Sequence, residues 1–524
     1  MKPTERPQAF SDPPTPTEFN MARYCLATSA AECPDKTALI VVQNEKSPKD
    51  AAEQWTYGQL DEAVRRIAAA LLDSGLRPGD RLMIRLPNTS SYALLFFGAL
   101  AAGIVPLPAS SQLAVDEAQF LLEDSAAAAI AIADEFDMPT SAIIRFTPED
   151  VMAMASYSRI ADYADTRADD PGYLVYTSGT SGTPKGVLHA HRAAWGRRPM
   201  YQGWYGIRSD DVVLHAGAFN WTYTLGVGLT DPWANGATTV LFTGKKNVQV
   251  WPLLLERYQA TLFAAVPSLY RQILKYCDLS EIDLSSFRHG LTAGEALSAA
   301  LLKNWRKAAG TDLFEALGMS ECSTYISTGP DIKIRAGSPG KPQPGRAIAI
   351  LDADDTSNNQ PLISERIGLL AIHRSDPGLM LGYWNRPDED AAVYRGDWFV
   401  GGDLARFDED GYLWYEGRAD DVMNAMGFRV SPLEVETAIA THPNVAEVGV
   451  CEIQVRSEVS IIAAFIVPID PDEADAASIL SHTADHLATY KQPREVVFVE
   501  TLPRSPNGKL LRRELAAAFS KTSG

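Results

Sequence analysis

The sequence has little that suits a membrane or a nucleic-acid partner. Its 524 residues carry 47 lysines and arginines against 66 aspartates and glutamates, a formal net charge of −19 at pH 7. Nucleic acids and anionic lipid surfaces repel so acidic a chain, so we expect neither as a partner. The longest apolar run, from Tyr92 to Leu107, is shorter than the ~20 residues that a membrane-spanning helix needs, and we expect no membrane span.

Cysteine is also scarce. The chain has 5 cysteines, an odd number without the paired spacing of a zinc site or the framework of a disulfide-rich protein. The N-terminal residues do not contain a basic segment followed by an apolar one, so we expect no secretory signal. Both absences indicate a reducing, cytoplasmic environment.

The chain does contain a regular alternation of helix and strand patterns. Residues 56–75 have a helical period that ends at Gly75, and residues 80–88 then read as a strand. The apolar face of this helix consists of Leu60, Ala63, Val64, Ile67, Leu71 and Leu72. Similar strands recur near residues 130, 172–176, 213, 240 and 264. Such alternation predicts an α/β fold with largely parallel sheets, and the length predicts two or more domains.

The last quarter of the chain has a different pattern. Near residue 400 a stretch rich in glycine, aspartate and aromatic residues predicts short antiparallel strands. Beyond residue 421 we expect a small α+β unit. There Ser431, Pro432 and Glu434 form a helix start, with a hydroxyl cap, a proline in the first turn and a carboxylate three residues after the cap.

A loop rich in glycine and hydroxyl side chains follows the strand at 172–176. The segment YTSGTSGTPKG, residues 176–186, ends in Lys185 and places backbone N–H groups and hydroxyls where a phosphate chain can bind. It is not a Walker A loop, which would need glycine at Pro184 and a hydroxyl residue at Gly186. A kinase or ATPase that releases ADP remains an alternative at this point.

Five ordered motifs resemble those of the adenylate-forming enzymes, which include acyl-CoA synthetases, peptide-synthetase adenylation domains and luciferases. The motifs lie at residues 176–186, 292–297, 316–323, 401–421 and 502–515. An aliphatic residue at Leu317 resembles the benzoate-type ligases, and medium-chain acyl-CoA ligases are also similar. The resemblance implies a large N-terminal domain, residues 1–419, with mixed sheets, helices and a distorted β-barrel subdomain. It also implies a small mobile α+β lid domain, residues 420–524.

The resemblance further implies a set of site residues. Lys509, Lys185 and Glu321 would be catalytic, and Glu321 and Thr177 would hold Mg²⁺. The ATP/AMP site would contain Thr177, Ser178, Gly179, Thr180, Ser181, Gly182, Thr183, Lys185, Gly294, Glu295, Ala296, Glu315, Ala316, Leu317, Gly318, Met319, Ser320, Asp403, Arg418 and Lys509. The hinge and CoA passage would involve Asp420, Gly427, Phe428 and Arg429. The acyl pocket would be lined by Trp221, Tyr223, Ala293, Gly318, Met319 and Ile326.

These residues suit a reaction between two anions. A carboxylate and a phosphate 4 Å apart repel by about 4 kcal/mol at an effective dielectric of ~20, so the site needs cations. Lys185, Lys509 and Mg²⁺ near Glu321 would supply them. The attacking carboxylate is already ionised at pH 7 and needs no general base. We expect ATP, Mg²⁺ and CoA as cofactors and co-substrates, and we expect His189, His191 and His215 to be structural.

The residues of the acyl pocket predict the class of acid. Tyr223 stands where amino-acid-activating domains carry an aspartate, and the position of Gly318 is tryptophan in acetyl-CoA synthetases, so an aryl or short cyclic acid is favoured. The resemblance thus implies a carboxylic acid:CoA ligase that forms acyl-AMP and pyrophosphate and then acyl-CoA. A medium-chain fatty acid ligase and an adenylation enzyme that loads a carrier protein remain alternatives, and a homodimer is a candidate assembly.

Overall fold

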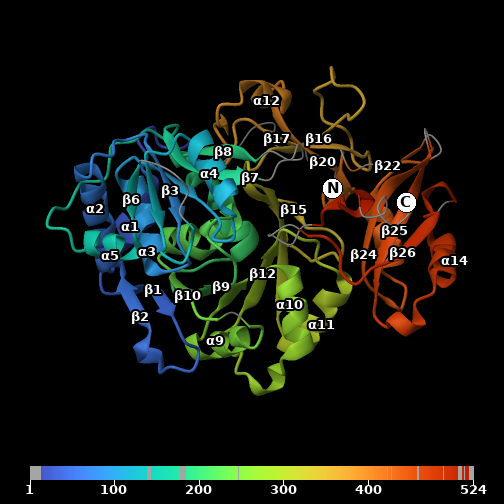
Figure 1. Cartoon of the computed structure of the whole chain (residues 1–524), viewed down its shortest axis with the longest axis horizontal. Helices are drawn as coiled ribbons and strands as arrows, with labels where there is room; N and C mark the ends of the chain where they lie inside the picture. The colour runs from blue at the N-terminus through green and yellow to red at the C-terminus, as the bar shows by residue number, and fades with distance from the viewer. Residues whose placement is uncertain are drawn as a thin grey trace. The chain divides into compact units, whose positions relative to one another are not determined.

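The computed structural model describes residues 13–137, 143–177, 184–245, 247–419, 421, 423–425, 428–456, 459–487, 489–504, 510–512 and 514–517. The chain divides into two compact units (Figure 1). The first contains residues 1–348 and 372–399, and the second contains residues 349–371 and 400–524. These two units are defined by how compactly their residues pack. The domain boundary predicted between residues 419 and 420 is instead a boundary between parts that move, so it stays a prediction. No described helix has the length and apolar character to cross a membrane.

A nine-stranded sheet forms the centre of the first unit. Its six inner strands run parallel, and antiparallel strands lie at both edges, which confirms the largely parallel sheet predicted from the helix and strand alternation. Its strands, in spatial order, are β15 (Lys341–Pro342), β14 (Ser323–Ser327), β13 (Asp312–Met319), β12 (His289–Ala293), β11 (Leu262–Ala264), β9 (Val212–His215), β10 (Thr238–Phe242), β1 (Thr37–Val42) and β2 (Glu53–Thr56).

Helices α9 (Val250–Tyr258), α10 (Pro267–Tyr276) and α11 (Ala299–Ala309) bury their apolar faces against this sheet (Figure 1). Trp305 of α11 is fully buried and meets Tyr270 of α10 edge to face, with ring centroids 4.8 Å apart. Such an arrangement of aromatic rings adds favourable electrostatics to the burial of their area. These helices fix the strand ends from which several predicted site residues extend.

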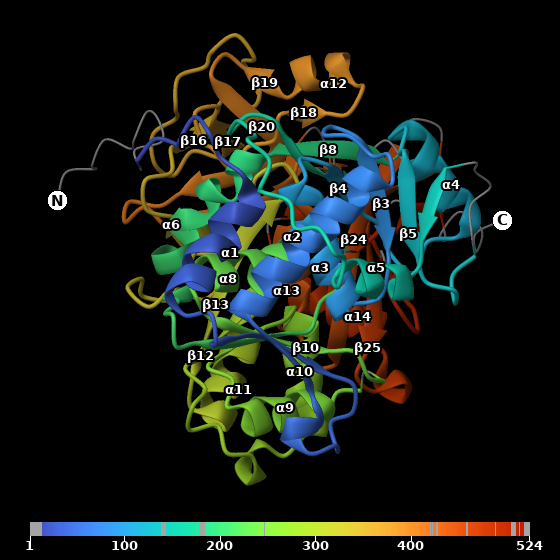
Figure 2. The same cartoon turned by 90° about the vertical axis from the view of Figure 1, so that its left-hand side faces the viewer.

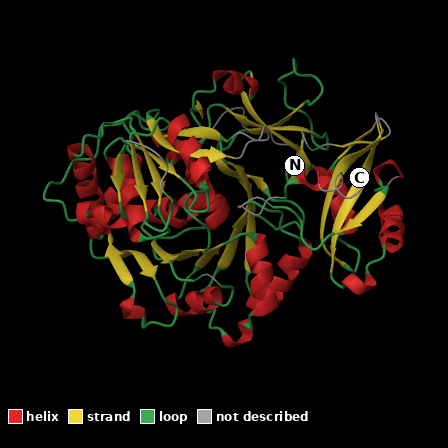
Figure 3. Cartoon of the chain, viewed as in Figure 1, coloured by secondary structure: helices red, strands yellow, loops and turns green. Residues whose placement is uncertain are grey.

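A second sheet of the same unit has four parallel strands. They are β4 (Val105–Pro108), β3 (Arg81–Arg85), β5 (Ala129–Ile132) and β6 (Ile144–Phe146), in that order. The unit also contains α1 (Met21–Glu32), α4 (Val115–Asp124), α5 (Pro148–Met154), α6 (Arg198–Met200), α7 (Thr222–Leu225) and α8 (Asp231–Ala234). Figure 3 distinguishes these helices from the strands.

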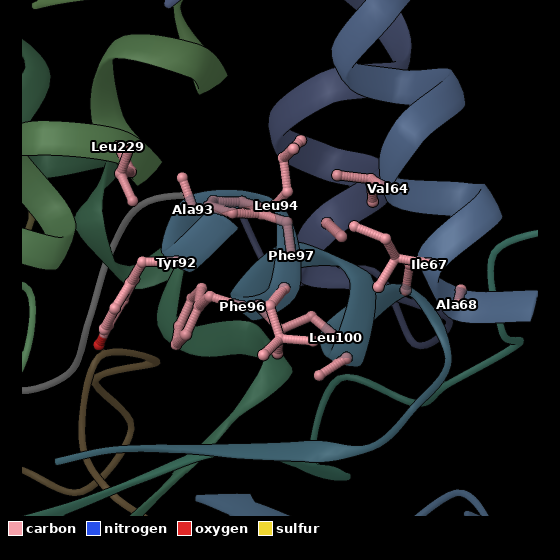
Figure 4. Close-up of a cluster of buried hydrophobic side chains, with 14 of the residues drawn as sticks. Val64, Ile67, Ala68, Tyr92, Ala93, Leu94, Phe96, Phe97, Leu100 and Leu229 are labelled. Atoms are coloured by element: carbon pink, nitrogen blue, oxygen red, sulfur yellow. The ribbon is translucent and has the colours of Figure 1, made fainter. Parts of the chain in front are cut away.

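Helices α2 (Tyr57–Asp73) and α3 (Ser90–Ala101) pack side by side (Figure 2). The helix predicted from Thr56 is confirmed: Thr56 and Gln59 form a capping box, and Gly75, at φ +101°, follows the end of α2. Every residue of α3 is buried. Figure 4 shows Val64 and Ile67 of α2 together with Phe96, Phe97 and Leu100 of α3.

The strand predicted at residues 172–176 belongs to an antiparallel sheet, so its assignment to the parallel series was wrong. Here β7 (Pro171–Thr177) pairs with β8 (Lys185–Ala190), and β8 pairs with β18 (Gly382–Tyr383). An apolar strand of this length looks the same in either kind of sheet, because both of its faces are buried. The hairpin of β19 (Tyr394–Arg395) with the start of β20 also belongs to the first unit, as does α12 (Pro387–Ala392).

Three strands have most of their residues in the second unit and lie in one sheet in the order β16 (Ile348–Leu351), β17 (Gly368–His373) and β20 (Trp398–Phe407). β21 (Leu413–Arg418) pairs antiparallel with β20, which confirms the short antiparallel strands predicted near residue 400. The remaining elements are β22 (Met423–Ala425), β23 (Phe428–Val430), α13 (Pro432–Ile439), β24 (Val445–Arg456), β25 (Val459–Pro468), α14 (Ala476–His486) and β26 (Glu495–Phe498).

The predicted helix start at Ser431 is confirmed, but its capping hydrogen bond is wrong. α13 begins at Pro432, yet the Ser431 hydroxyl donates to the carbonyl of Glu416 in β21 instead of accepting from the first turn. The hydroxyl therefore ties the helix to the neighbouring strand. A capping motif in a sequence cannot exclude such a tertiary partner.

Candidate active site

The glycine-rich loop joins two antiparallel strands. Thr177, the last residue of β7, lies opposite Lys185, the first residue of β8, so both stand at the base of the loop. Residues 178–183, and with them Ser178, Gly179, Thr180, Ser181, Gly182 and Thr183, lie outside the described residues. A Walker A loop leads from a strand into a helix, whereas this loop leads from a strand into a strand. This geometry argues against the kinase or ATPase alternative.

Lys185 has two neighbours from the segment that contains β18 and α12. Its ammonium forms an ion pair with Glu389 of α12 and lies 5.5 Å from the ring centroid of Tyr383 in β18. Antiparallel pairing of Tyr383 with Val187, two residues beyond Lys185, brings the two strands together. The Lys185 side chain is 21% exposed, so a ligand can still approach it.

Glu321 lies in the turn between β13 and β14. The Tyr383 hydroxyl donates a hydrogen bond of 2.8 Å to Glu321 Oε1, and the backbone N–H of Met380 donates to the Glu321 carbonyl at 2.8 Å. Carboxylate and hydroxyl oxygens are the ligands that Mg²⁺ prefers, so Glu321 and Thr177 fit the predicted metal site chemically. Tyr383 thus contacts both the predicted metal ligand and the predicted phosphate ligand.

Two buried histidines make structural hydrogen bonds, one of them to the turn that contains Glu321. Burial lowers the pKa of His189 to about 4, and its Nε2 lies 2.8 Å from the Ser320 carbonyl, to which the neutral ring donates. Burial likewise lowers the pKa of His191 to about 4, and its Nδ1 accepts from the backbone N–H of Met21 at 3.1 Å. Both rings make structural contacts, as the sequence analysis expected of them.

The predicted adenine-side loop follows β12. Leu297 N–H donates a hydrogen bond of 3.0 Å to Oε1 of Glu315 in β13, which holds the end of the loop against the sheet. Burial raises the pKa of Glu315 to about 7, and this backbone hydrogen bond partly opposes the shift. Glu295 accepts from the Ser268 hydroxyl at 3.0 Å, so α10 anchors the loop from its other side. Gly294 and Ala296, on either side of Glu295, are exposed.

The predicted acyl pocket has aromatic walls. The rings of Trp221 and Tyr223 meet edge to face with centroids 5.1 Å apart, and Tyr223 also packs against Trp204 at 5.9 Å. The Tyr223 hydroxyl is buried and donates to the Leu291 carbonyl at 3.4 Å. Gly294 has φ +91°, and a Cβ placed there would lie 2.7 Å from Cη2 of Trp221. The loop and the tryptophan therefore pack closely against each other.

Other predicted pocket residues lie on β12, β13 and β14. Ala293 and Ile326 are buried, and Met319 is half-buried. At Gly318 a Cβ would lie 2.4 Å from the backbone oxygen of Ser323, so a side chain at this position would meet β14 first. The other predicted nucleotide residues of β13, Ala316, Leu317 and Ser320, follow Glu315 along the same strand and its turn.

In the second unit, Asp403 of β20 and Arg418 of β21 are direct partners across the strand pair. Arg418 Nη1 lies 3.4 Å from Asp403 Oδ1 and donates to the Gly401 carbonyl at 2.6 Å. The Tyr415 hydroxyl donates to Asp403 Oδ1 at 3.0 Å. The carboxylate predicted to bind the ribose is therefore held in one orientation by two neighbours.

Three predicted residues of the second unit, Asp420, Gly427 and Lys509, lie outside the described residues. Phe428 and Arg429 are described only as backbone residues of β23. Tyr383 and Glu389 were not predicted from the sequence. Their segment, GYWNRPDED, has no pattern that indicates a contact with residues some sixty or two hundred positions earlier.

Two protein-family models match the chain. A family model described as AMP-binding enzyme matches residues 26–384, and one described as AMP-binding enzyme C-terminal domain matches residues 434–509. The chain belongs to the AMP-binding enzyme family. This confirms the resemblance inferred from the five motifs, and with it the predicted fold class.

Some of the similar proteins are ligases named for a particular acid substrate, and others are named only as acyl-CoA ligases. The chain is 31% identical to the benzoate-CoA ligase of Thauera aromatica over 489 residues, which are 90% of this chain and 92% of that one. It is 30% identical over 518 residues to an uncharacterized acyl-CoA ligase of Bacillus subtilis, 95% of this chain and 96% of that one. A solved anthranilate CoA ligase in complex with anthranoyl-AMP has a TM-score of 0.85 and 27% identity, covering 97% of this chain and 99% of that chain.

The chain is an AMP-forming acyl-CoA synthetase. The enzyme uses ATP and Mg²⁺ to couple a carboxylic acid to CoA, and the reaction proceeds through acyl-AMP. These findings confirm the predicted enzyme class, cofactors and co-substrates.

Proposed function

We propose that this enzyme activates an aryl or short cyclic carboxylic acid. The observation that carries the proposal is the pair of aromatic rings, Trp221 and Tyr223, that meet edge to face beside the exposed loop at Gly294. Flat acids pack well against aromatic rings, and none of the predicted pocket residues carries a charge that would anchor an amino acid. Relatives named for benzoate and anthranilate support the same class.

The proposal assigns the charged residues of the first unit to the adenylation step. Lys185 binds ATP phosphate at the base of the glycine-rich loop, and Glu321 and Thr177 hold Mg²⁺. The bound metal supplies positive charge that offsets the repulsion between carboxylate and phosphate. Tyr383 orients the Glu321 carboxylate through its 2.8 Å hydrogen bond. The acid attacks the α-phosphorus, pyrophosphate leaves, and the product is acyl-AMP.

Residues of the second unit complete the proposal. Asp403 and Arg418 bind the ribose, and Lys509 contacts the carboxylate and the α-phosphate. A small domain at residues 420–524 then turns about Asp420 relative to residues 1–419, so that Gly427, Phe428 and Arg429 guide the thiol of CoA to the acyl-AMP carbonyl. Glycine at position 427 would allow close approach of the pantetheine chain to the backbone.

The acid preference is tested by acid-dependent AMP release. Benzoate, cyclohexanecarboxylate and straight-chain acids of increasing length are compared in the presence of ATP, Mg²⁺ and CoA. We expect the highest kcat/KM with a flat or cyclic acid. A preference for octanoate over every ring acid would favour the medium-chain alternative, and release of ADP instead of AMP would contradict the reaction altogether.

The acceptor and the role of Lys509 need separate assays. Transfer of the acyl group to free CoA rather than to a phosphopantetheinyl carrier protein is expected. Lys509→Ala should abolish adenylate formation and spare thioester formation from synthetic acyl-AMP. Equal loss of both half-reactions would contradict the assigned role.

We also propose that the enzyme works in the cytoplasm. All five cysteines are free in the structure, which suits a reducing cytoplasm. Light scattering of the purified enzyme tests whether it forms the candidate homodimer.

A further inference from the structure

The ion pair of Lys185 with Glu389 is a feature that the predicted reaction does not require. Glu389 lies in the first turn of α12 and its side chain is 35% exposed, while Lys185 is 21% exposed. The pair therefore sits at the edge of the site, where a ligand can reach it. The Glu389 carboxylate thus binds the same Lys185 ammonium that the proposed function assigns to ATP phosphate.

Glu389 has a second cationic neighbour. Its Oε1 lies 3.9 Å from Arg386 Nε, and Arg386 is itself held by Asp124 at 2.6 Å. When Lys185 turns to another anion, the Glu389 carboxylate still has the Arg386 guanidinium beside it. Exchange of partners therefore does not leave an isolated charge, which keeps the cost of displacement low.

Phosphate and carboxylate compete for the same kind of donor. An ammonium group binds either anion as a compact point charge, so one lysine cannot serve both fully at the same time. We propose that Glu389 occupies Lys185 in the nucleotide-free enzyme, that ATP phosphate displaces it, and that Glu389 thereby weakens ATP binding. The inference rests on the proposed function, because it takes Lys185 as the phosphate ligand.

The size of the effect follows from the exposure of the pair. Partly exposed ion pairs are typically worth about 0.2–1 kcal/mol, which corresponds to a change in affinity of about 1.5- to 5-fold. Glu389→Gln should therefore tighten ATP binding by that factor. Salt screens such pairs, so the difference between variant and wild type should shrink as ionic strength rises.

The experiment measures ATP binding by calorimetry to the full chain with Mg²⁺ and without acid. Glu389→Gln is compared with Asp388→Asn, its exposed neighbour in the same turn, which removes one negative charge one residue away. We expect tighter binding only in Glu389→Gln. Unchanged or weaker binding in Glu389→Gln, or equal tightening in Asp388→Asn, would overturn the inference.

Two further variants separate this inference from the proposed function. Lys185→Met should weaken ATP binding, and adding Glu389→Gln to Lys185→Met should then have no effect. If Lys185→Met binds ATP as well as the exposed-site control Lys303→Met, the phosphate role of Lys185 fails, and this inference fails with it. If Lys185→Met weakens binding but Glu389→Gln does not strengthen it, only the role of Glu389 is wrong.

Discussion

The Tyr383 hydroxyl donates to Glu321 Oε1 at 2.8 Å, and the same ring lies 5.5 Å from the ammonium of Lys185. One side chain thus lies between two groups of opposite charge that the proposed reaction uses separately. Burial, and then the negative charge of Glu321, raise the pKa of the Tyr383 phenol, so it remains a hydrogen-bond donor at neutral pH. We therefore expect Tyr383 to position Glu321, the proposed metal ligand.

Tyr383→Phe removes the hydroxyl and keeps the ring beside Lys185. Loss of an outer-shell partner typically lowers metal affinity about 10- to 100-fold, so we expect the Mg²⁺ concentration for half-maximal pyrophosphate exchange to rise by about tenfold or more. ATP binding without metal should change little. Tyr276→Phe, at a ring that is 55% exposed, serves as the control. An unchanged Mg²⁺ dependence would contradict the positioning role.

The periodic parts of the fold were predictable from the sequence. α2 was predicted because its apolar spacing and its stop at Gly75 lie in one continuous stretch of the sequence. The parallel strands were predicted because helices separate them along the chain. The antiparallel pairing of β7 with β8 was not, because a buried strand carries no signal of its partner's direction.

The residues of the candidate site also fall into those that the sequence suggested and those that it did not. Lys185 and Glu321 could be proposed from the sequence because each lies in a motif whose neighbours suggest a role, and these roles stay predictions. Tyr383 and Glu389 were missed because their roles arise from contacts between distant segments, which β18 brings to β8. The hydroxyl of Ser431 is a third such case, since its partner lies across the fold rather than in its own helix.

Asp231→Asn should destabilise the first unit strongly. Asp231 is fully buried and accepts from Arg197 Nε at 2.7 Å and Nη2 at 2.6 Å. The substitution leaves the Arg197 guanidinium buried without its counter-charge, which typically costs about 3–5 kcal/mol. Asp169→Asn, whose carboxylate pairs with Arg192 but is 75% exposed, should cost about 1 kcal/mol or less. Urea unfolding measures both, and similar costs would contradict the argument.

Glu315 should make stability depend on pH. Burial raises its pKa from 4.5 to about 7, so the folded state holds the proton more tightly than the unfolded state. The contribution is complete below about pH 4.5 and is lost as pH rises through about 7, and at 1.36 kcal/mol per unit it amounts to about 3 kcal/mol. Glu315→Gln keeps an acceptor for Leu297 and cannot ionise.

The measurement compares urea unfolding of wild type and Glu315→Gln at pH 5 and pH 8. We expect wild type to lose stability relative to the variant between these values. Glu135→Gln, at an exposed carboxylate, controls for the loss of one charge. A constant difference between wild type and Glu315→Gln across this range would show that the carboxyl does not titrate there.

Gly294→Ala tests whether Trp221 forms a wall of the acid site. The added Cβ would lie 2.7 Å from Trp221 Cη2, so the indole must move, and we expect the KM for the acid to rise several-fold. Gly310→Ala is the matched control, because Gly310 also has a positive φ, +70°, but its Cβ would meet nothing within 4 Å. Both variants should lose about 1–2 kcal/mol of stability from backbone strain. Only Gly294→Ala should change the KM, and an equal change in both would mean that strain, rather than displacement of Trp221, controls acid binding.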